Sequence, residues 1–505
     1  MRAPARKNPR LAPGAVATHL LCLYPDRDER APQLCAEMLL TLVANGYTAP
    51  SSTSEFTSPK RQQFATRSLA LGVNFLAGHD HAQYGEDLAG AGSVGGSANL
   101  SLAQEALQGL VDPSTQKVQR GAWLLRPFHE SLLWYDARCS NGMWTVRKVH
   151  MRGTGITLAR MLLAPPGDET SKQQGAAAVD AVRTALTAAS PLADISERLE
   201  GVLPAGQAYN RAPTTEDDEL TAWDRGADPR LLELAERFCR HTEGVMRQDG
   251  ASGPARLWQL RSVIALDIAT HIVRSAWNRT DTPANEQFLL LSFDGGPRAT
   301  DPVRQRSEHF YRRSRLRISS AVVQTLAERM RDLHREGADW ASEFEQRSGL
   351  GSDEQSSIAS QLRALASDAT AEDYERVARA AAEASDYDRG AGNSYRVLLE
   401  SLGMLVGTGA YRYLTAGPDL LGALVGALSA QMPMSSRDFF RAIRSEWGLV
   451  VNQEAASATA LASMLDGAAL ERNARKAEKL MSDAGLAVGL SDRTTMVGER
   501  AGRSR

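Results

Sequence analysis

One stretch near the middle of the chain constrains the fold most, because a short apolar run stops at glycines and leads into an arginine-dense helix. The apolar residues 288–293 have the length of a buried strand, and Asp-Gly-Gly-Pro at 294–297 ends it. Asp301 followed by Pro302 is typical of a helix start, an N-cap residue before proline at the first helical position. The sequence therefore predicts a buried strand at 288–293 and a helix that begins at Pro302.

Length and composition favour a mainly helical, multi-domain protein. A chain of 505 residues is long enough for two to four domains, each with its own core. Alanine and leucine are plentiful and only 6% of the residues are aromatic, which favours helices over a sandwich or barrel. The net charge of −2 excludes a uniformly basic coat for nucleic acid, so any site for a polyanion must be a local patch. We expect a mainly α fold with a smaller α+β part at the N-terminal end.

Composition shifts and turn signals predict the domain organisation. Asn141-Gly142 lies between two runs of strand-forming residues and predicts a β-hairpin. Residues 204–228 combine prolines and glycine with the acidic cluster 216–219, which indicates a boundary. The expected order is a disordered basic arm at 1–15, an α+β domain with a hairpin at 16–205, a linker at 206–228, a helical domain with one short strand at 229–415, and a last domain at 416–505.

The last ninety residues have a distinctive order of elements. Helical patterns over 418–430 and from Ser435 to Gly448 precede a short strand at 449–451, and a further helix covers 468–484. Residues 486–490 and 494–497 then read as a small β-hairpin. Helices followed by such a hairpin resemble a winged-helix domain. The resemblance rests on element order over 416–505, and it implies that the helix 468–484 enters a DNA groove.

Two groups of basic residues point to an anionic partner. Six arginines and a single acid, Glu308, lie between positions 304 and 317, and the helix 468–484 gathers basic side chains opposite its apolar face. Phosphate groups are the partners that such clusters commonly bind. The candidate nucleic-acid-binding residues are Arg304, Arg306, Arg312, Arg313, Arg315, Arg317, Arg472, Arg475, Lys476 and Lys479.

Each basic group also has an ordinary structural explanation. The face on 468–484 is compatible with a solvated amphipathic helix, and the arginines at 304–317 are compatible with pairing to the acids 216–219 across a domain interface. If the central helix does bind nucleic acid, His309, Phe310 or Tyr311 offers a surface on which a base stacks.

The sequence holds no assembled catalytic, metal or cofactor motif. His79-Asp80-His81 is the densest acid/base or metal candidate, but no further ligands follow at recognisable spacing and a surface turn explains it. Residues 90–95 match G-x-G-x-x-G without the preceding strand that a dinucleotide site needs. Cys239 and His241 point in different directions on a helix, and we interpret the four cysteines as reduced thiols. We expect no metal and no cofactor.

Three functions fit these observations. The first is a non-enzymatic accessory subunit of a bacterial multiprotein assembly, cytoplasmic and without a membrane segment, that binds nucleic acid, DNA above RNA, and other protein subunits. Large bacterial chains without catalytic motifs often serve antiphage defence, a general expectation that rests on no residue here. The second is a protein-binding scaffold whose arginines meet acidic partners. The third is an enzyme with a site assembled from distant residues, for which His79, Asp80, His81 and Asp294 are the first candidates.

Overall fold

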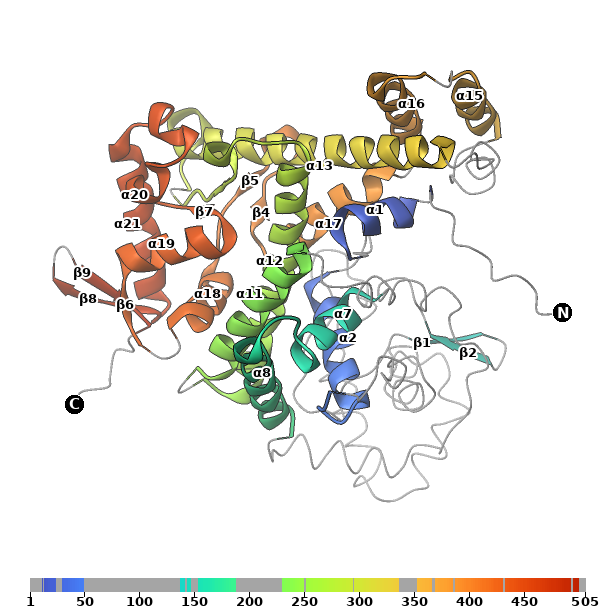
Figure 1. The fold of residues 1–505 in the computed structure, drawn as a ribbon. Coiled ribbons are helices and arrows are strands. Elements are labelled where there is room, and N and C mark those ends of the chain that lie inside the picture. Colours follow the sequence, from blue (N-terminus) through green and yellow to red (C-terminus); the bar gives the residue numbers. More distant parts are fainter. Residues whose placement is uncertain are drawn as a thin grey trace.

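The computed structural model is mostly helical, with a few short strands (Figure 1). It describes residues 11, 13–23, 30–49, 137–140, 143–146, 153–187, 229–248, 251–293, 295–335, 352–365, 368–384, 387–429, 432–491 and 494–498. The mainly helical fold expected from the composition is therefore confirmed. The domain boundaries stay predictions, since residues 1–10 of the arm predicted at 1–15 and the whole linker at 206–228 lie outside the described residues. α1 begins at Pro13, within the arm that was predicted to be disordered.

The helices follow the apolar periodicity of the sequence. They are α1 (Pro13–Leu21), α2 (Ala31–Ala44), α7 (Thr154–Leu163), α8 (Glu169–Thr187), α11 (Pro229–Met246), α12 (Gly253–Arg279), α13 (Pro302–Arg335), α15 (Ser352–Arg363), α16 (Ala371–Ala384), α17 (Tyr387–Ser401), α18 (Pro418–Ser429), α19 (Ser436–Trp447), α20 (Gln453–Ala456) and α21 (Gly467–Asp483). Short 3-10 helices are η5 (Ala284–Glu286), η6 (Arg298–Thr300), η7 (Gly409–Tyr411) and η8 (Ala460–Ser463).

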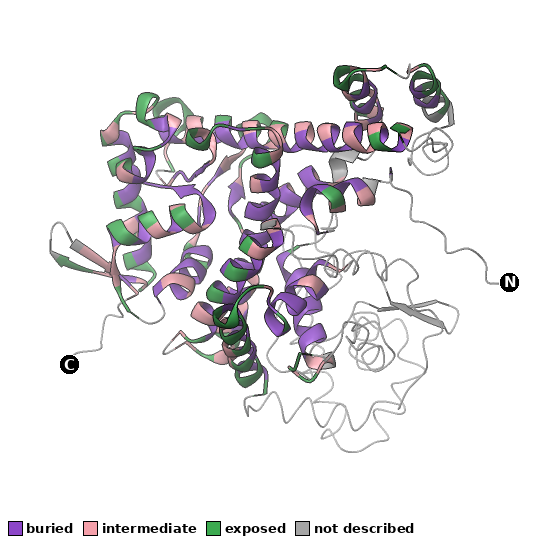
Figure 2. Ribbon diagram, viewed as in Figure 1, coloured by how far each residue is buried: buried purple, intermediate pink, exposed green. Residues whose placement is uncertain are grey.

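The central element is α12, which is buried along most of its length (Figure 2). It contacts α11, α13, α17, α18 and α2, so apolar residues cover nearly its whole circumference. A helix surrounded in this way needs apolar side chains on all faces, and the run from Leu257 to Trp277 supplies them. The 34-residue α13 runs across one end of α12 (Figure 1).

A set of very short strands joins the centre of the chain to its C-terminal part. β3 (Leu289–Leu290) pairs in parallel with β7 (Leu449–Val450), and Leu291 forms a parallel bridge with Leu414 of β5 (Tyr413–Leu414). β5 in turn pairs antiparallel with β4 (Leu405–Val406). The strand predicted at 288–293 is therefore shorter than expected, because only Leu289–Leu290 form β3 and Leu291 adds a bridge, although residues 288–292 are buried. The helix after it begins at Pro302 as predicted, with the Asp301 carboxylate accepting from the Arg304 amide at 2.9 Å.

The C-terminal part contains a separate three-stranded antiparallel sheet. β8 (Ala487–Ser491) and β9 (Thr494–Val497) form the predicted hairpin, and β6 (Met434–Ser435) pairs with the other edge of β9. The strand order is therefore β6-β9-β8. The Ser435 hydroxyl accepts from the Asp438 amide at the start of α19, and Gly448, at a φ of +72°, ends that helix. Both helix ends were predicted from the sequence.

A β-hairpin is also present in the N-terminal part. β1 (Ala137–Ser140) and β2 (Met143–Val146) pair antiparallel, with Ser140 opposite Met143. The predicted turn residues Asn141-Gly142 join these strands in sequence but lie outside the described residues.

Candidate nucleic-acid interface

The basic face of α21 is exposed, and its apolar face is buried. The Asp466 side chain accepts from the Ala468 amide at 3.2 Å and caps the helix. Leu470, Ala474, Ala477 and Met481 are buried against the core. The four predicted basic residues on the opposite side are all exposed: Arg472, Arg475, Lys476 and Lys479. The amphipathic pattern of the sequence is thus realised, with the charges in solvent.

A buried amide fixes α21 to the strands beneath it. The Asn473 side chain donates to the carbonyls of Leu291 and Val451, each at 2.9 Å, and accepts from the Phe293 amide at 2.7 Å. Asn473 is 1% exposed, so these bonds are shielded from water. The role of Asn473 was not predicted from the sequence. The feature that indicates it is a single polar residue within the apolar stripe of the helix, between Leu470 and Ala477.

The charges on α21 differ in how they are balanced. Lys479 forms an exposed pair with Asp483 at 2.9 Å, one turn along the helix. Within the described part of the chain, Arg472 and Arg475 have no ion pair. An exposed pair such as Lys479–Asp483 contributes little to stability and breaks readily. At least two guanidinium groups are therefore available to an anionic ligand.

Two of the six arginines between positions 304 and 317 of α13 are committed to internal ion pairs. Arg304 lies 3.6 Å from Glu308, a carboxylate with 0% exposure that also binds Arg298 at 2.8 Å. Arg313 pairs with Glu286 at 2.6 Å. Because Glu308 is buried, its charge needs these cations, and Arg304 therefore has a structural role beside any role in binding.

The other four arginines between positions 304 and 317 have no ion pair with described residues. Arg312 is exposed, and Arg306, Arg315 and Arg317 are half-buried. Desolvation, then the charges of Arg306, Arg313 and Arg312, lower the pKa of the His309 between them. The acids 216–219, which we considered as partners for these arginines, lie outside the described residues. The positive charge of these four arginines is therefore not balanced by any described acid.

Base stacking on α13 is restricted to one side chain. Phe310 and Tyr311 are buried, Phe310 against Phe288 at a ring distance of 4.4 Å and Tyr311 against Tyr395 at 6.2 Å. The prediction that Phe310 or Tyr311 offers a stacking surface is therefore wrong, because both rings are needed by the core. Only His309 is exposed.

The two basic helices meet at one small core. Val303 and Phe310 of α13 belong to the same buried cluster as Ala469 and Leu470 of α21. The helices contact each other directly, and Figure 1 shows α21 beside the end of α13 where that helix begins. The two groups of candidate residues, more than 150 positions apart in sequence, thus belong to neighbouring elements.

A buried polar network lies away from these helices. His241 donates or accepts through Nδ1 to Asp267 at 3.0 Å, and its Nε2 lies 3.3 Å from Glu446. Burial alone lowers the pKa of His241, but Asp267 and Glu446 outweigh it and the net shift is upward. The bond to His241 is the main reason that the pKa of Glu446 falls to about 2. This network joins three helices.

The cysteine next to that network is not a nucleophile. Cys239 directs its Sγ to the Met161 carbonyl at 3.5 Å, away from His241, and burial raises the pKa of its thiol to about 12. The expectation that Cys239 and His241 point apart is confirmed. Cys22, Cys35 and Cys239 are not disulfide-bonded, as expected.

Other site predictions are not tested by the described residues. His79, Asp80, His81 and the glycines of 90–95 lie outside them, as does Asp294. Among the residues that are described, no group of three or more His, Cys, Asp or Glu side chains could hold a metal ion. No helix in these ranges is long and apolar enough to cross a membrane.

Comparisons with known proteins identify no relative of this chain. No family model matches it, and neither a curated protein nor a solved structure matches it.

Proposed function

We propose that this protein is a nucleic-acid-binding subunit that contacts the phosphates of duplex DNA through α21. The observation that carries the proposal is the exposed basic face of α21, formed by Arg472, Arg475, Lys476 and Lys479. The two arginines of this face have no ion pair with described residues. The opposite face is held by the Asn473 hydrogen bonds, so the charges project from a fixed support. A rigid helix with unbalanced positive charge suits a regularly spaced row of phosphates.

The order of the neighbouring elements supports a winged-helix-like arrangement. α18, β6, α19, α21, β8 and β9 follow one another, and the strand between the first two helices pairs with the last strand of the hairpin. In a winged helix the last of the three helices enters the major groove, which is the place of α21 here. The chain departs from the simple pattern between α19 and α21, where β7, α20 and η8 are inserted.

The hairpin β8–β9 would serve as the wing. Leu490, near its tip, is 61% exposed, which is unusual for a leucine on so short a strand. Minor-groove contacts often use an apolar side chain of this kind as a wedge. The proposal therefore places α21 in the major groove and Leu490 towards an adjacent minor groove.

We assign the protein to a larger assembly as an accessory, non-enzymatic subunit. The buried His241 network joins α11, α12 and α19 through polar contacts among His241, Asp267, Glu446 and Trp447. A protein that binds nucleic acid without catalytic activity acts by bringing a partner protein to the nucleic acid. The proposal of protein partners rests on this argument. A role in antiphage defence rests only on the general expectation for large bacterial chains without catalytic motifs, and on no residue of this chain.

One observation favours a scaffold role for α13. Leu316 is 69% exposed on the same helix as Arg312 and Arg317. An exposed aliphatic residue among arginines is typical of a protein interface, where arginine is enriched and apolar contacts form the centre. Our second candidate function is therefore a protein-binding surface on α13, compatible with DNA binding by α21.

Charge reversal separates these proposals. The triple variant Arg472→Glu, Arg475→Glu and Lys479→Glu should lose affinity for duplex DNA, measured by fluorescence anisotropy at low salt. The matched control is Lys172→Glu, Arg183→Glu and Arg376→Glu, which changes the net charge equally at exposed residues of α8 and α16. Equal loss in both variants would reduce the effect to overall charge and contradict a site on α21.

A second pair of variants tests the surface on α13. Leu316→Ser with Arg312→Glu should abolish co-purification with a protein partner and leave DNA affinity within twofold of the parent protein. If this variant instead loses DNA binding and keeps its protein partner, α13 belongs to the DNA path.

A further inference from the structure

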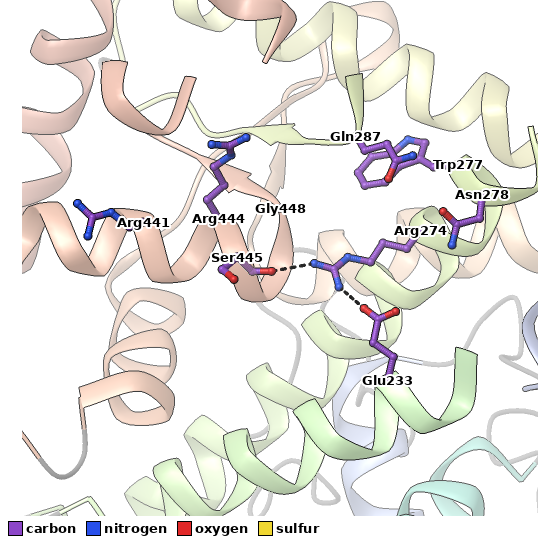
Figure 3. A pocket seen from close by; sticks show the side chains of 9 residues that line it. All are labelled: Glu233, Arg274, Trp277, Asn278, Gln287, Arg441, Arg444, Ser445 and Gly448. Atoms are coloured by element: carbon purple, nitrogen blue, oxygen red, sulfur yellow. Dashed lines mark hydrogen bonds and ion pairs between the residues drawn. The ribbon is translucent and has the colours of Figure 1, made fainter. Parts of the chain in front are cut away.

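A polar cavity lies where α11, α12 and α19 meet, apart from the basic face of α21. Its volume is about 430 Å³, within the usual range of roughly 300–1,000 Å³ for small-molecule sites. Figure 3 shows its lining side chains coming from all three helices and from the segment that leads into β3. They belong to Glu233, Arg274, Trp277, Asn278, Gln287, Arg441, Arg444, Ser445 and Gly448.

The cavity carries an excess of positive charge. Its single acid, Glu233, is shared between Arg274 at 2.7 Å and Arg237 at 3.0 Å. Arg441 is balanced by Asp438 and Glu454, at 3.1 and 2.8 Å, and lies at the far end of the group in Figure 3.

Arg444 is the unbalanced cation of this site. It is half-buried, lies between Arg441 and Arg274 in Figure 3, and has no side-chain partner within the described part of the chain. A guanidinium group that is partly removed from water without a partner favours an anionic ligand, and its planar donors match the oxygens of a phosphate. Arg274 lies beside it and is held in place by the carbonyls of Ser445 and Glu446, at 3.1 and 3.0 Å.

The rest of the lining suits a nucleobase. Asn278 and Gln287 contribute amides, while Trp277, which is 2% exposed, belongs to the core behind the lining. Gln287 donates from Nε2 to the Thr282 carbonyl at 2.7 Å, which orients its side chain and leaves Oε1 to accept from a ligand. Amide donors and acceptors together match the hydrogen-bonding edge of a base.

We propose that this cavity binds a nucleoside monophosphate, with the phosphate at Arg444 and Arg274 and the edge of the base at Asn278 and Gln287. The site contains no residue of α21, so its test is independent of the test of DNA binding. A ligand here bridges α12 and α19, the helix that follows β6 in the C-terminal part.

Calorimetric titration of the full chain with AMP, GMP, CMP and UMP tests the proposal. At least one should bind with a stoichiometry of one. Arg444→Gln should weaken that binding by about tenfold or more, since a charge-assisted contact contributes on that scale. Arg437→Gln is the matched control, because Arg437 is an exposed arginine of the same helix, paired with Glu454 and outside the cavity. It should change the affinity less than twofold.

Further ligands and a second variant divide the proposal into its parts. Inorganic phosphate and the unphosphorylated nucleoside should each bind more weakly than the nucleotide. Asn278→Ala, at an exposed position, should weaken nucleotide binding and leave phosphate binding unchanged. The site is overturned if none of the four nucleotides gives a heat of binding at millimolar concentration. It is also overturned if a folded Arg444→Gln variant binds the nucleotide as tightly as the parent protein. A nucleoside that binds as tightly as its monophosphate overturns the phosphate contact, and phosphate that binds as tightly as the nucleotide overturns the base contact.

Discussion

The indole Nε1 of Trp447 donates a 2.7 Å hydrogen bond to the carboxylate of Asp267, and both side chains are fully buried. His241 stacks on the same indole at a ring distance of 4.3 Å and contacts the same carboxylate. One buried acid therefore ties α11, α12 and α19 together. Since α19 leads to α21, this network links the support of the candidate DNA-binding helix to the central helix of the fold.

Removal of that acid should destabilise the protein strongly. We expect Asp267→Ala to lower the free energy of unfolding by about 3–5 kcal/mol, because it leaves a buried imidazole and indole without their partner. Trp447→Phe should cost about 1–3 kcal/mol through the lost bond to Asp267. Urea denaturation followed by circular dichroism measures both. Asp180→Ala, at an exposed site on α8, should stay within about ±0.5 kcal/mol, and equal values for all three variants would refute the network.

The network should also make stability depend on pH. The folded pKa of His241 is raised above 6.5, so its contribution is complete below that value and disappears as pH rises through the folded pKa. Glu446 has a folded pKa of about 2 against 4.5, so its contribution is complete above 4.5 and disappears as pH falls towards 2. The free-energy difference between the parent protein and His241→Gln should therefore be largest between pH 4.5 and 6.5 and shrink above that window. A difference that grows between pH 6.5 and 9 would contradict these shifts.

A close approach of two helices depends on Gly244. A Cβ atom at this position of α11 would lie 2.3 Å from the Ala427 carbonyl oxygen of α18, and backbone cannot yield cheaply. Gly244→Ala should destabilise the protein by about 1–3 kcal/mol, as overpacking usually does. Gly417→Ala is the control, because nothing lies within 4 Å of its Cβ position. Thermal melting of both variants gives the comparison, and a parent-like melting temperature for Gly244→Ala would place the helices further apart than described.

Asn473 should matter for binding although it carries no charge. Asn473→Leu leaves two carbonyls and one amide without their partner, each at a cost of about 1–3 kcal/mol. The support of α21 should loosen, and DNA affinity should fall without a change in the number of basic residues. Asn285→Leu, at an exposed position in η5, controls for added apolar surface. Full DNA affinity in a destabilised Asn473→Leu protein would show that the basic face acts without its support.

Local signals in the sequence predicted the local structure. Ser435 and Gly448 bound α19, Asp301-Pro302 starts α13, and the alternation at 486–497 gives the hairpin β8–β9. Caps, prolines and glycines act over a few residues, so a single sequence reveals them. The parallel pairing of Leu289–Leu290 with Leu449–Val450 could not be predicted, because those segments are 160 positions apart and only the folded core brings them together.

The candidate site was predicted in part for the same reason. The four basic residues of α21 lie on one face because helical periodicity places them there. For α13, charge density alone could not show that Arg304 neutralises the buried Glu308 or that Arg313 pairs with Glu286 in η5. The cavity around Arg444 was not predicted either, since its lining combines α11 and α12 with α19, which begins more than 150 positions after α12 ends.

The salt dependence of duplex DNA binding tests the central claim most directly. If Arg472, Arg475 and Lys479 each neutralise a phosphate, the slope of log affinity against log salt should become shallower by about 0.9 for each contact removed in the triple charge-reversal variant. Its unfolding free energy should stay within about ±0.5 kcal/mol of the parent, since all three side chains are exposed. The account predicts that the parent protein binds duplex DNA with a steep slope. It also predicts that the slope of the variant is shallower by close to the sum of three contacts. An identical slope in both proteins would contradict it.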